Sequence, residues 1–168
     1  MVEMISALLV YDREGTFDTL KHILESQCIA AKVARSCGEA LFSIWGKQPP
    51  HLVFTDVQLA DGNWSDVISL AGRCRLPVNV IVVSRQVDVK FYVEAIERGA
   101  FDFMTPPFEV SDATHVIRSA AQNALSRRHP GLFDRAKGAG SSHTALPRRN
   151  PLVTSVTVGE PVDKGPSL

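Results

Sequence analysis

Two aspartates and a serine follow separate apolar runs, and their oxygen atoms are the first candidates for chemistry. Asp12, Asp56 and Ser84 each stand where such a run ends. A carboxylate can attack an electrophile while it stays ionised at neutral pH, and its oxygens also bind hard cations. The alternative interpretation is that the two aspartates only cap or solvate the loops that begin there. The choice depends on whether the fold brings these ends together.

The elements that must position these residues alternate between two hydrophobic periods. Short runs rich in β-branched residues predict strands, and apolar residues at helical spacing predict helices. We expect strands at 5–11, 30–35, 51–55, 78–84 and 101–104, and helices at 14–27, 37–45, 65–74, 88–98 and from about 111 onward. Near-continuous apolar strands and their alternation with helices predict a doubly wound parallel α/β sheet. Sites in such sheets lie beyond the carboxyl ends of the strands, so the three side chains should converge.

The chain changes character near residue 129. The segment 129–168 holds five of the ten prolines and five of the eleven glycines in a chain of 168 residues. Such a composition cannot bury enough apolar area to offset the entropy of ordering it. We therefore expect one folded domain over 1–128 and a disordered extension over 129–168. An alternative is that Leu152–Val158 adds a strand to a sheet edge.

Charge and cysteine content exclude several classes of protein. Eighteen Lys and Arg balance eighteen Asp and Glu, which argues against a broad nucleic-acid-binding surface. Binding through the basic residues Lys137, Arg148 and Arg149 remains as an alternative. Three cysteines without a C-x-x-C pair, no secretory signal and no apolar run of about 18 residues predict a cytoplasmic protein with no membrane contact.

Several segments, taken in order, resemble the receiver domain of two-component response regulators. They are 8–12, 52–62, 80–84, and 95–103 with Pro107-Phe108, and the resemblance spans about residues 4–128. It implies a five-stranded (βα)5 flavodoxin-like receiver with strand order 2-1-3-4-5. It also implies a single-domain response regulator in a phosphorelay, which is not an enzyme.

The resemblance assigns a role to each matching residue. Asp56 matches the aspartate that accepts a phosphoryl group from a histidine kinase. Ser84 matches the hydroxyl residue that turns toward that group, and Phe103 matches the aromatic switch residue. Asp12 matches the first of two acidic residues that help to hold Mg²⁺, and Gln58 would supply a backbone carbonyl to the ion.

Two positions depart from the family pattern. Arg13 stands where the family has its second acidic residue, and Pro106 stands where it has a lysine. A guanidinium offers Mg²⁺ no oxygen ligand and repels it, so we expect weak or absent metal binding by Asp12, Asp56 and the carbonyl of Gln58. The proline that follows the lysine in the family is kept as Pro107, and we predict a cis Pro106–Pro107 peptide.

Arg13 has three interpretations from the sequence alone. It can pair with Asp56 or Asp12 in place of the metal, and an adjacent arginine lowers an aspartate pKa by about 1–3 units. It can instead point into solvent, or it can stabilise a phosphoryl group directly.

The expected function is signalling through protein contacts. The partners would be a histidine kinase or phosphotransfer protein and a downstream protein, with a homodimer also expected, on the face formed by residues 88–128. The alternative is a degenerate, metal-independent receiver that acts as a constitutive adaptor without phosphorylation. A flavodoxin-like electron carrier or a small α/β enzyme fits the fold. The segment after the first strand, however, is too poor in Gly, Ser and Thr for a phosphate loop.

Overall fold

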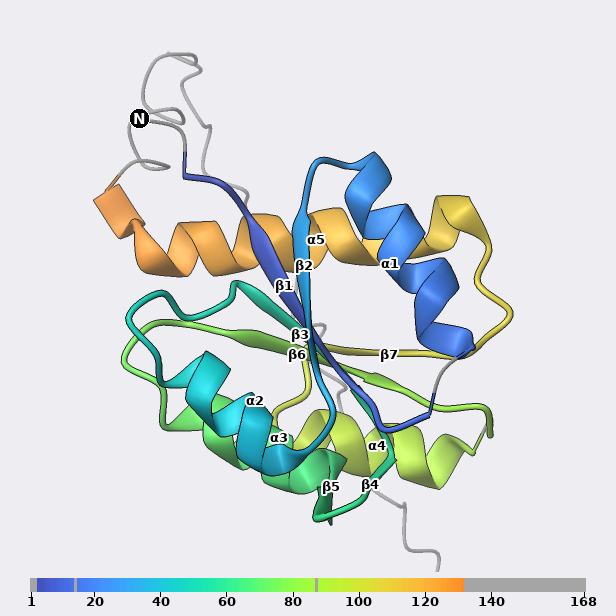
Figure 1. Cartoon of the computed structure of the whole chain (residues 1–168). Coiled ribbons are helices and arrows are strands. Elements are labelled where there is room, and N and C mark those ends of the chain that lie inside the picture. Colours follow the sequence, from blue (N-terminus) through green and yellow to red (C-terminus); the bar gives the residue numbers. More distant parts are fainter. Residues whose placement is uncertain (1–2, 14, 87, 132–168) are drawn as a thin grey trace, which may run out of the picture.

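The sequence folds into a central sheet with helices on both faces (Figure 1). The computed structural model describes residues 3–13, 15–86 and 88–131. In chain order the elements are β1 (Ser6–Val10), α1 (Thr16–Ser26), β2 (Ala30–Ala34), α2 (Cys37–Ile44), β3 (Leu52–Asp56), β4 (Gln58–Leu59), β5 (Gly62–Asn63), α3 (Trp64–Gly72), β6 (Asn79–Val83), α4 (Val89–Glu97), β7 (Asp102–Met104) and α5 (Val110–Arg128).

The five main strands run parallel in the order β2-β1-β3-β6-β7, which confirms the predicted strand order. The boundaries of the predicted helices and strands agree with the structure to within two residues. The antiparallel β4–β5 hairpin was not predicted from the sequence, because each strand has only two residues and shows no hydrophobic period.

Two hydrophobic layers separate the sheet from its helices. Helices α1 and α5 cover one face, and α2, α3 and α4 cover the other (Figure 1). In β1 and β3, Leu9 and Phe54 point toward α1 and α5, whereas Leu8 and Val53 point toward the opposite layer. Each fully buried side chain of this kind stabilises the fold by roughly 1.5–3 kcal/mol. Burial on both faces explains why these strands are apolar without alternation.

The extension predicted over 129–168 lies outside the described residues except for 129–131. The candidate strand Leu152–Val158 and the basic residues Lys137, Arg148 and Arg149 are in the part that is not described. In the described part of the chain, no helix is long and apolar enough to cross a membrane.

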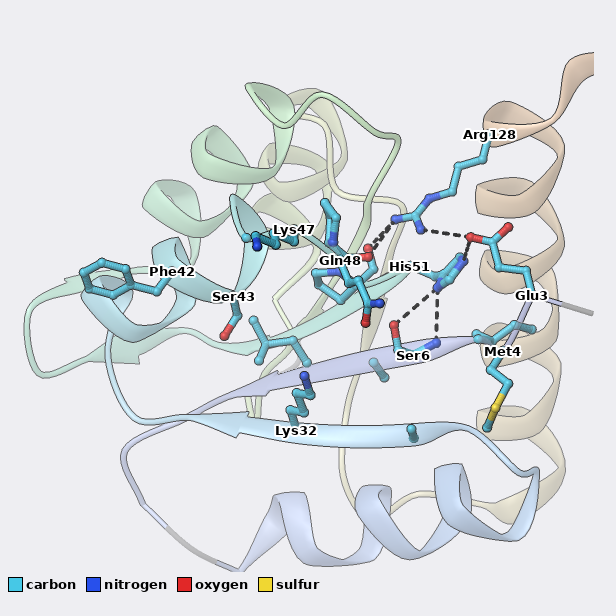
Figure 2. Close-up of a pocket in the computed structure, with 17 residues that line it drawn as sticks. Glu3, Met4, Ser6, Lys32, Phe42, Ser43, Lys47, Gln48, His51 and Arg128 are labelled. Carbon is cyan, nitrogen blue, oxygen red and sulfur yellow. Dashed lines mark hydrogen bonds and ion pairs between the residues drawn. The ribbon is translucent and has the colours of Figure 1, made fainter.

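The end of α5 is held against the amino-terminal edge of the sheet by Arg128 (Figure 2). Its guanidinium donates hydrogen bonds to the carbonyl oxygens of Pro50 at 2.6 Å, Pro77 at 2.9 Å and Pro49 at 3.3 Å. It also lies 3.6 Å from the carboxylate of Glu3, and only 3% of the Arg128 side chain is exposed. These contacts join α5 to the loops that precede β3 and β6.

The carboxylate of Glu3 contacts two histidines at the same edge of the sheet. His51 Nε2 lies 3.0 Å from one Glu3 carboxylate oxygen and His129 Nε2 lies 2.6 Å from the other. The Nδ1 atom of His51 accepts a hydrogen bond from the backbone N–H of Ser6, so we assign the proton of the neutral ring to Nε2. Burial, followed by the charge of Arg128, lowers the pKa of His51, although Glu3 opposes the shift. His51 is therefore a structural histidine beneath a groove of about 870 Å³.

Replacing Arg128 with Ala should lower the free energy of unfolding by about 2–3 kcal/mol, because buried carbonyl oxygens lose their donors. Urea denaturation followed by circular dichroism measures the loss. Arg118→Ala is the matched control, since Arg118 is exposed on the same helix and its removal should change stability by less than about 0.5 kcal/mol. Equal losses in the two variants would contradict the structural role of Arg128.

Candidate functional site at the carboxyl edge of the sheet

The register of three parallel strands brings the predicted site residues to one edge of the sheet. Val10 of β1 pairs with Thr55 of β3, and Asp56 pairs with Val83 of β6. Thr55 in turn pairs with Val82, so Asp12 and Ser84 each lie two residues beyond aligned positions of β1 and β6. The sheet thus gathers Asp12, Asp56 and Ser84, as predicted from the sequence.

Asp56 is the half-buried carboxylate at this edge. Its Oδ1 atom accepts a hydrogen bond of 2.7 Å from the backbone N–H of Val57. Burial raises the pKa of Asp56 above its usual value, and the negative charge of Asp12 raises it further. The Val57 N–H and the positive charges of Arg85 and Arg13 act in the opposite direction.

The pKa of Asp56 is not lowered below its usual value, so the interpretation in which Arg13 lowers it is not supported. The loss of solvent around Asp56 outweighs the attraction of the guanidinium, which is weaker than that of Arg85. Both Arg13 and Asp12 are exposed, and within the described residues Arg13 forms no ion pair within 4.0 Å. The interpretation that Arg13 projects into solvent fits these observations best.

Arg85 is a charged residue of this site that the sequence analysis missed. Its Nε and Nη2 atoms donate hydrogen bonds to the hydroxyl oxygen of Thr16, at 3.2 and 3.0 Å. Thr16 is the first residue of α1, so Arg85 connects the end of β6 to the start of α1. The position of Arg85 directly after Ser84 could have indicated from the sequence that it belongs to the site. Only the fold shows that its side chain reaches α1.

Ser84 is buried at the end of β6 and interacts with its own loop. Its hydroxyl donates to the carbonyl oxygen of Gln86 at 3.2 Å and accepts from the N–H of Gln86 at 3.1 Å. Its backbone N–H donates to the carbonyl oxygen of Met104 at 3.0 Å, which ties the loop to β7. If the hydroxyl turned toward another acceptor, it would lose its hydrogen bonds with Gln86 and form a new one with that acceptor.

Phe103 of β7 belongs to a row of aromatic rings that includes α4. Its ring centroid lies 5.5 Å from that of Phe91 and 6.0 Å from that of Tyr92, both in edge-to-face geometry. Phe91 in turn lies 5.2 Å from Trp64 at the start of α3. Phe103 is half-buried beneath α4, and its role as a switch residue stays a prediction.

The loop after Asp56 is held by the amino terminus of α2. The Asp61 carboxylate accepts hydrogen bonds from the N–H groups of Cys37 at 2.7 Å and Gly38 at 2.9 Å. These bonds lower the pKa of Asp61. A Cβ atom at Gly62 would lie 2.7 Å from Asp66 Oδ2 and 2.8 Å from the Cys37 sulfur, so a larger residue there would have to displace these side chains. Gln58 is exposed in this hairpin.

Pro106 and Pro107 follow β7, and the peptide bond between them is cis, as predicted. Pro106 is half-buried and carries no charge, so the position at which the family has a lysine supplies no cation here.

The donor set at this edge fits a magnesium ion poorly. It consists of the carboxylates of Asp12 and Asp56 with the backbone carbonyl of Gln58, and Arg13 contributes no oxygen. Two guanidinium groups, those of Arg13 and Arg85, act electrostatically on Asp56. In the part of the chain that the structure describes, no group of three or more His, Cys, Asp or Glu residues could hold a metal ion.

The fold and these strand-end residues define a receiver-type signalling domain, and comparison with known proteins agrees. The family model for the response regulator receiver domain matches residues 7–118. The photosynthetic apparatus regulatory protein RegA of Cereibacter sphaeroides is 26% identical over 118 residues, covering 70% of this chain and 64% of RegA. The nitrogen assimilation regulatory protein NtrX of Azorhizobium caulinodans is 28% identical over 123 residues, covering 72% of this chain and 27% of NtrX.

Solved receiver structures share the fold. NtrX from Brucella abortus superposes with a TM-score of 0.68 at 25% identity, covering 83% of this chain and 32% of that one. The non-phosphorylated HemR receiver domain from Leptospira biflexa gives a TM-score of 0.59 at 25% identity, covering 70% of this chain and 94% of that one.

The chain belongs to the response regulator receiver domain family, whose members act in two-component signalling. Members of the family bind Mg²⁺ and interact with histidine kinases and downstream partners. The chain spans less than two thirds of the length of the curated relatives RegA and NtrX.

Replacing Asp56 with Asn should stabilise the protein, and the gain should grow as the pH rises. The pKa of Asp56 is higher in the folded protein than its unfolded value near 3.8. The folded state therefore loses stability as the pH rises from the unfolded pKa to the folded pKa, because the buried carboxyl group has to ionise. Asn keeps the oxygen that accepts from Val57 but cannot ionise. Thermal unfolding of both proteins between about pH 3 and pH 7 tests this prediction.

Asp61→Asn is the matched control with the opposite sign. The lowered pKa of Asp61 means that its carboxylate stabilises the fold above its unfolded pKa and loses this effect in acid. Asp61→Asn should therefore be less stable than the unmodified protein at neutral pH and approach it in acid. A pH-independent difference for Asp56→Asn would contradict the assignment of a desolvated carboxylate.

Proposed function

We propose that Asp56 accepts a phosphoryl group from a phosphohistidine of a histidine kinase or phosphotransfer protein, and that the domain is a phosphorelay switch rather than an enzyme. The observation that carries this proposal is the half-buried carboxylate of Asp56 at the edge where Asp12 and Ser84 also lie. Its place in the fold matches the phosphoacceptor position of the family.

The transfer requires one attacking oxygen with a defined orientation. The N–H of Val57 holds Oδ1 of Asp56, which orients Oδ2 as the nucleophile. Oδ2 forms a bond to phosphorus while the phosphorus–nitrogen bond of the donor histidine breaks, and the imidazole nitrogen keeps the electron pair and takes a proton. The product is an acyl phosphate, whose additional negative charge and acceptor oxygens attract the Ser84 hydroxyl.

Phosphorylation in this chain should depend only weakly on Mg²⁺. The proposal is supported by the donor chemistry at this edge, where Arg13 takes the place of an oxygen ligand. A permanent cation beside the carboxylates lowers the affinity of the site for a divalent ion. No step of the transfer proposed here therefore passes through the metal.

We further propose that a downstream protein docks on the face formed by α4, β7 and α5. Helix α4 exposes four apolar side chains at helical spacing, with 74, 45, 45 and 37% of their surfaces accessible, namely Val89, Tyr92, Val93 and Ile96. Exposed apolar side chains grouped in this way are typical of interaction surfaces. Phe103 contacts Tyr92 on this helix, so a movement of its ring would alter the surface.

A constitutive adaptor is the second candidate function. It is favoured by Arg13 and Pro106, which remove a metal ligand and a phosphoryl-binding cation from the family pattern. In this form the α4 surface would be presented permanently, without phosphorylation of Asp56.

Incubation with acetyl phosphate should add about 80 Da to the protein, the mass of one phosphoryl group. Intact-mass spectrometry measures the gain, which should persist in Asp12→Asn and disappear in Asp56→Asn. Because the Asn amide is a poor nucleophile, its failure to react locates the modified residue. An unmodified mass in the native protein, with donor activity shown on another receiver, would favour the adaptor.

Replacing Arg13 with Asp should strengthen Mg²⁺ binding by at least about 10-fold, because it exchanges a repelling cation for an oxygen ligand. The native protein should bind Mg²⁺ with a dissociation constant above about 1 mM. NMR titration with MgCl₂ measures both affinities. Arg118→Asp makes the same charge change away from the site, and an equal gain in that control would contradict the prediction.

A further inference from the structure

Arg85 lies across the carboxyl edge of the sheet from β6 to α1. Within the described residues, both hydrogen bonds of its guanidinium end on the neutral hydroxyl of Thr16, at 3.2 and 3.0 Å. Thr16 begins α1, and the N-cap residue Gly15 has no side chain with which to accept a hydrogen bond from the first turn. The guanidinium is therefore held beside a helix end that itself carries partial positive charge.

The same guanidinium acts on the phosphoacceptor. Asp56 pairs in register with Val83, two residues before Arg85, and the carboxylate is attracted more by Arg85 than by Arg13. Pro106 supplies no charge at this edge. Of the two guanidinium groups that act on Asp56, only that of Arg85 donates hydrogen bonds to other described residues, and these bonds fix its position.

We propose that Arg85 is the residue that binds the phosphoryl oxygens on Asp56, releasing the hydroxyl of Thr16 to do so. This inference rests on the proposed phosphorylation of Asp56 and names the cation that supports it. Arg85, in the loop between β6 and α4, would supply the positive charge that is missing at the position of Pro106.

The exchange is favourable because the two acceptors differ in charge. A hydroxyl oxygen is neutral, whereas the phosphoryl group carries about −1.5 to −2 charges at neutral pH. Guanidinium hydrogen bonds to phosphate are bidentate and roughly twice as strong as those between neutral groups. During transfer, Arg85 would also stabilise the charge that develops on the phosphoryl oxygens while the bond to the donor breaks.

Arg85 also lies three residues before the start of the proposed output surface, at Asp88. The β6–α4 loop ends at Asp88, whose carboxylate caps α4 by accepting a hydrogen bond from the N–H of Lys90 at 2.9 Å. A change of partner by Arg85 would therefore occur within the segment that leads into α4.

The experiment compares the initial rate of phosphorylation of the full chain by acetyl phosphate in four variants, followed by intact mass. Arg85→Gln should be slower by about 10-fold or more, and Arg85→Lys should recover part of the rate because it keeps the charge. Thr16→Val is the matched control, since it removes the same hydrogen bonds but leaves the guanidinium, and Arg118→Gln removes an exposed cation on α5, away from the site. Both controls should stay within about 3-fold of the native rate.

A second readout reports on Arg85 itself. The Nε–H resonance of Arg85 in the NMR spectrum should move when the native protein is phosphorylated and stay in place in Asp56→Asn. Melting temperatures of all variants show whether any loss of rate comes from loss of fold.

The outcomes separate the two proposals. If the native protein takes up no phosphoryl group, the phosphorylation proposal fails, and the role of Arg85 fails with it. If the native protein is phosphorylated but a folded Arg85→Gln reacts as fast, or Thr16→Val is as slow as Arg85→Gln, only the role of Arg85 is overturned. If Arg85→Gln does not fold, the rate of Arg85→Lys and the Nε–H resonance of Arg85 test the proposal instead. A resonance that does not move when the native protein is phosphorylated overturns the role of Arg85.

Discussion

The parallel register of β1, β3 and β6 is the constraint on which the site depends. These strands are apolar and buried on both faces, so a shift of one residue would move their side chains between the two hydrophobic layers. The carboxyl ends of these strands are therefore the first positions at which the chain can place polar side chains outside the two hydrophobic layers. Asp12, Asp56 and Ser84 occupy those first positions, and burial of Asp56 raises the pKa of its carboxyl group.

The charges around Asp56 distinguish this receiver from the family pattern. Two carboxylates, those of Asp12 and Asp56, are opposed by two guanidinium groups, those of Arg13 and Arg85. A guanidinium can neutralise phosphoryl charge, as a metal ion does, but its geometry is fixed by its own side chain. At this edge the charges of Arg85 and Arg13 act on Asp56 against that of Asp12.

The two edges of the sheet use polar groups in opposite ways. At the amino-terminal edge, Arg128 and Glu3 direct their hydrogen bonds to carbonyl oxygens and to histidines of the same domain, which stabilises the end of α5. At the carboxyl edge, Arg85 and Ser84 donate hydrogen bonds of 3.0–3.2 Å to neutral oxygens, which a charged acceptor can replace. The first edge is suited to holding one structure, and the second is suited to exchange.

The sequence by itself determined the fold class, the strand order through a family resemblance, and the convergence of Asp12, Asp56 and Ser84. These conclusions depend on local periodicity and on parallel strands sharing one carboxyl edge, both of which can be read along the chain. Only the tertiary structure decided that burial of Asp56 outweighs the attraction of Arg13, since the loss of solvent depends on all neighbouring elements. It alone joined Arg85 to Thr16, 69 positions away, because spacing carries no information on which loop a long side chain reaches.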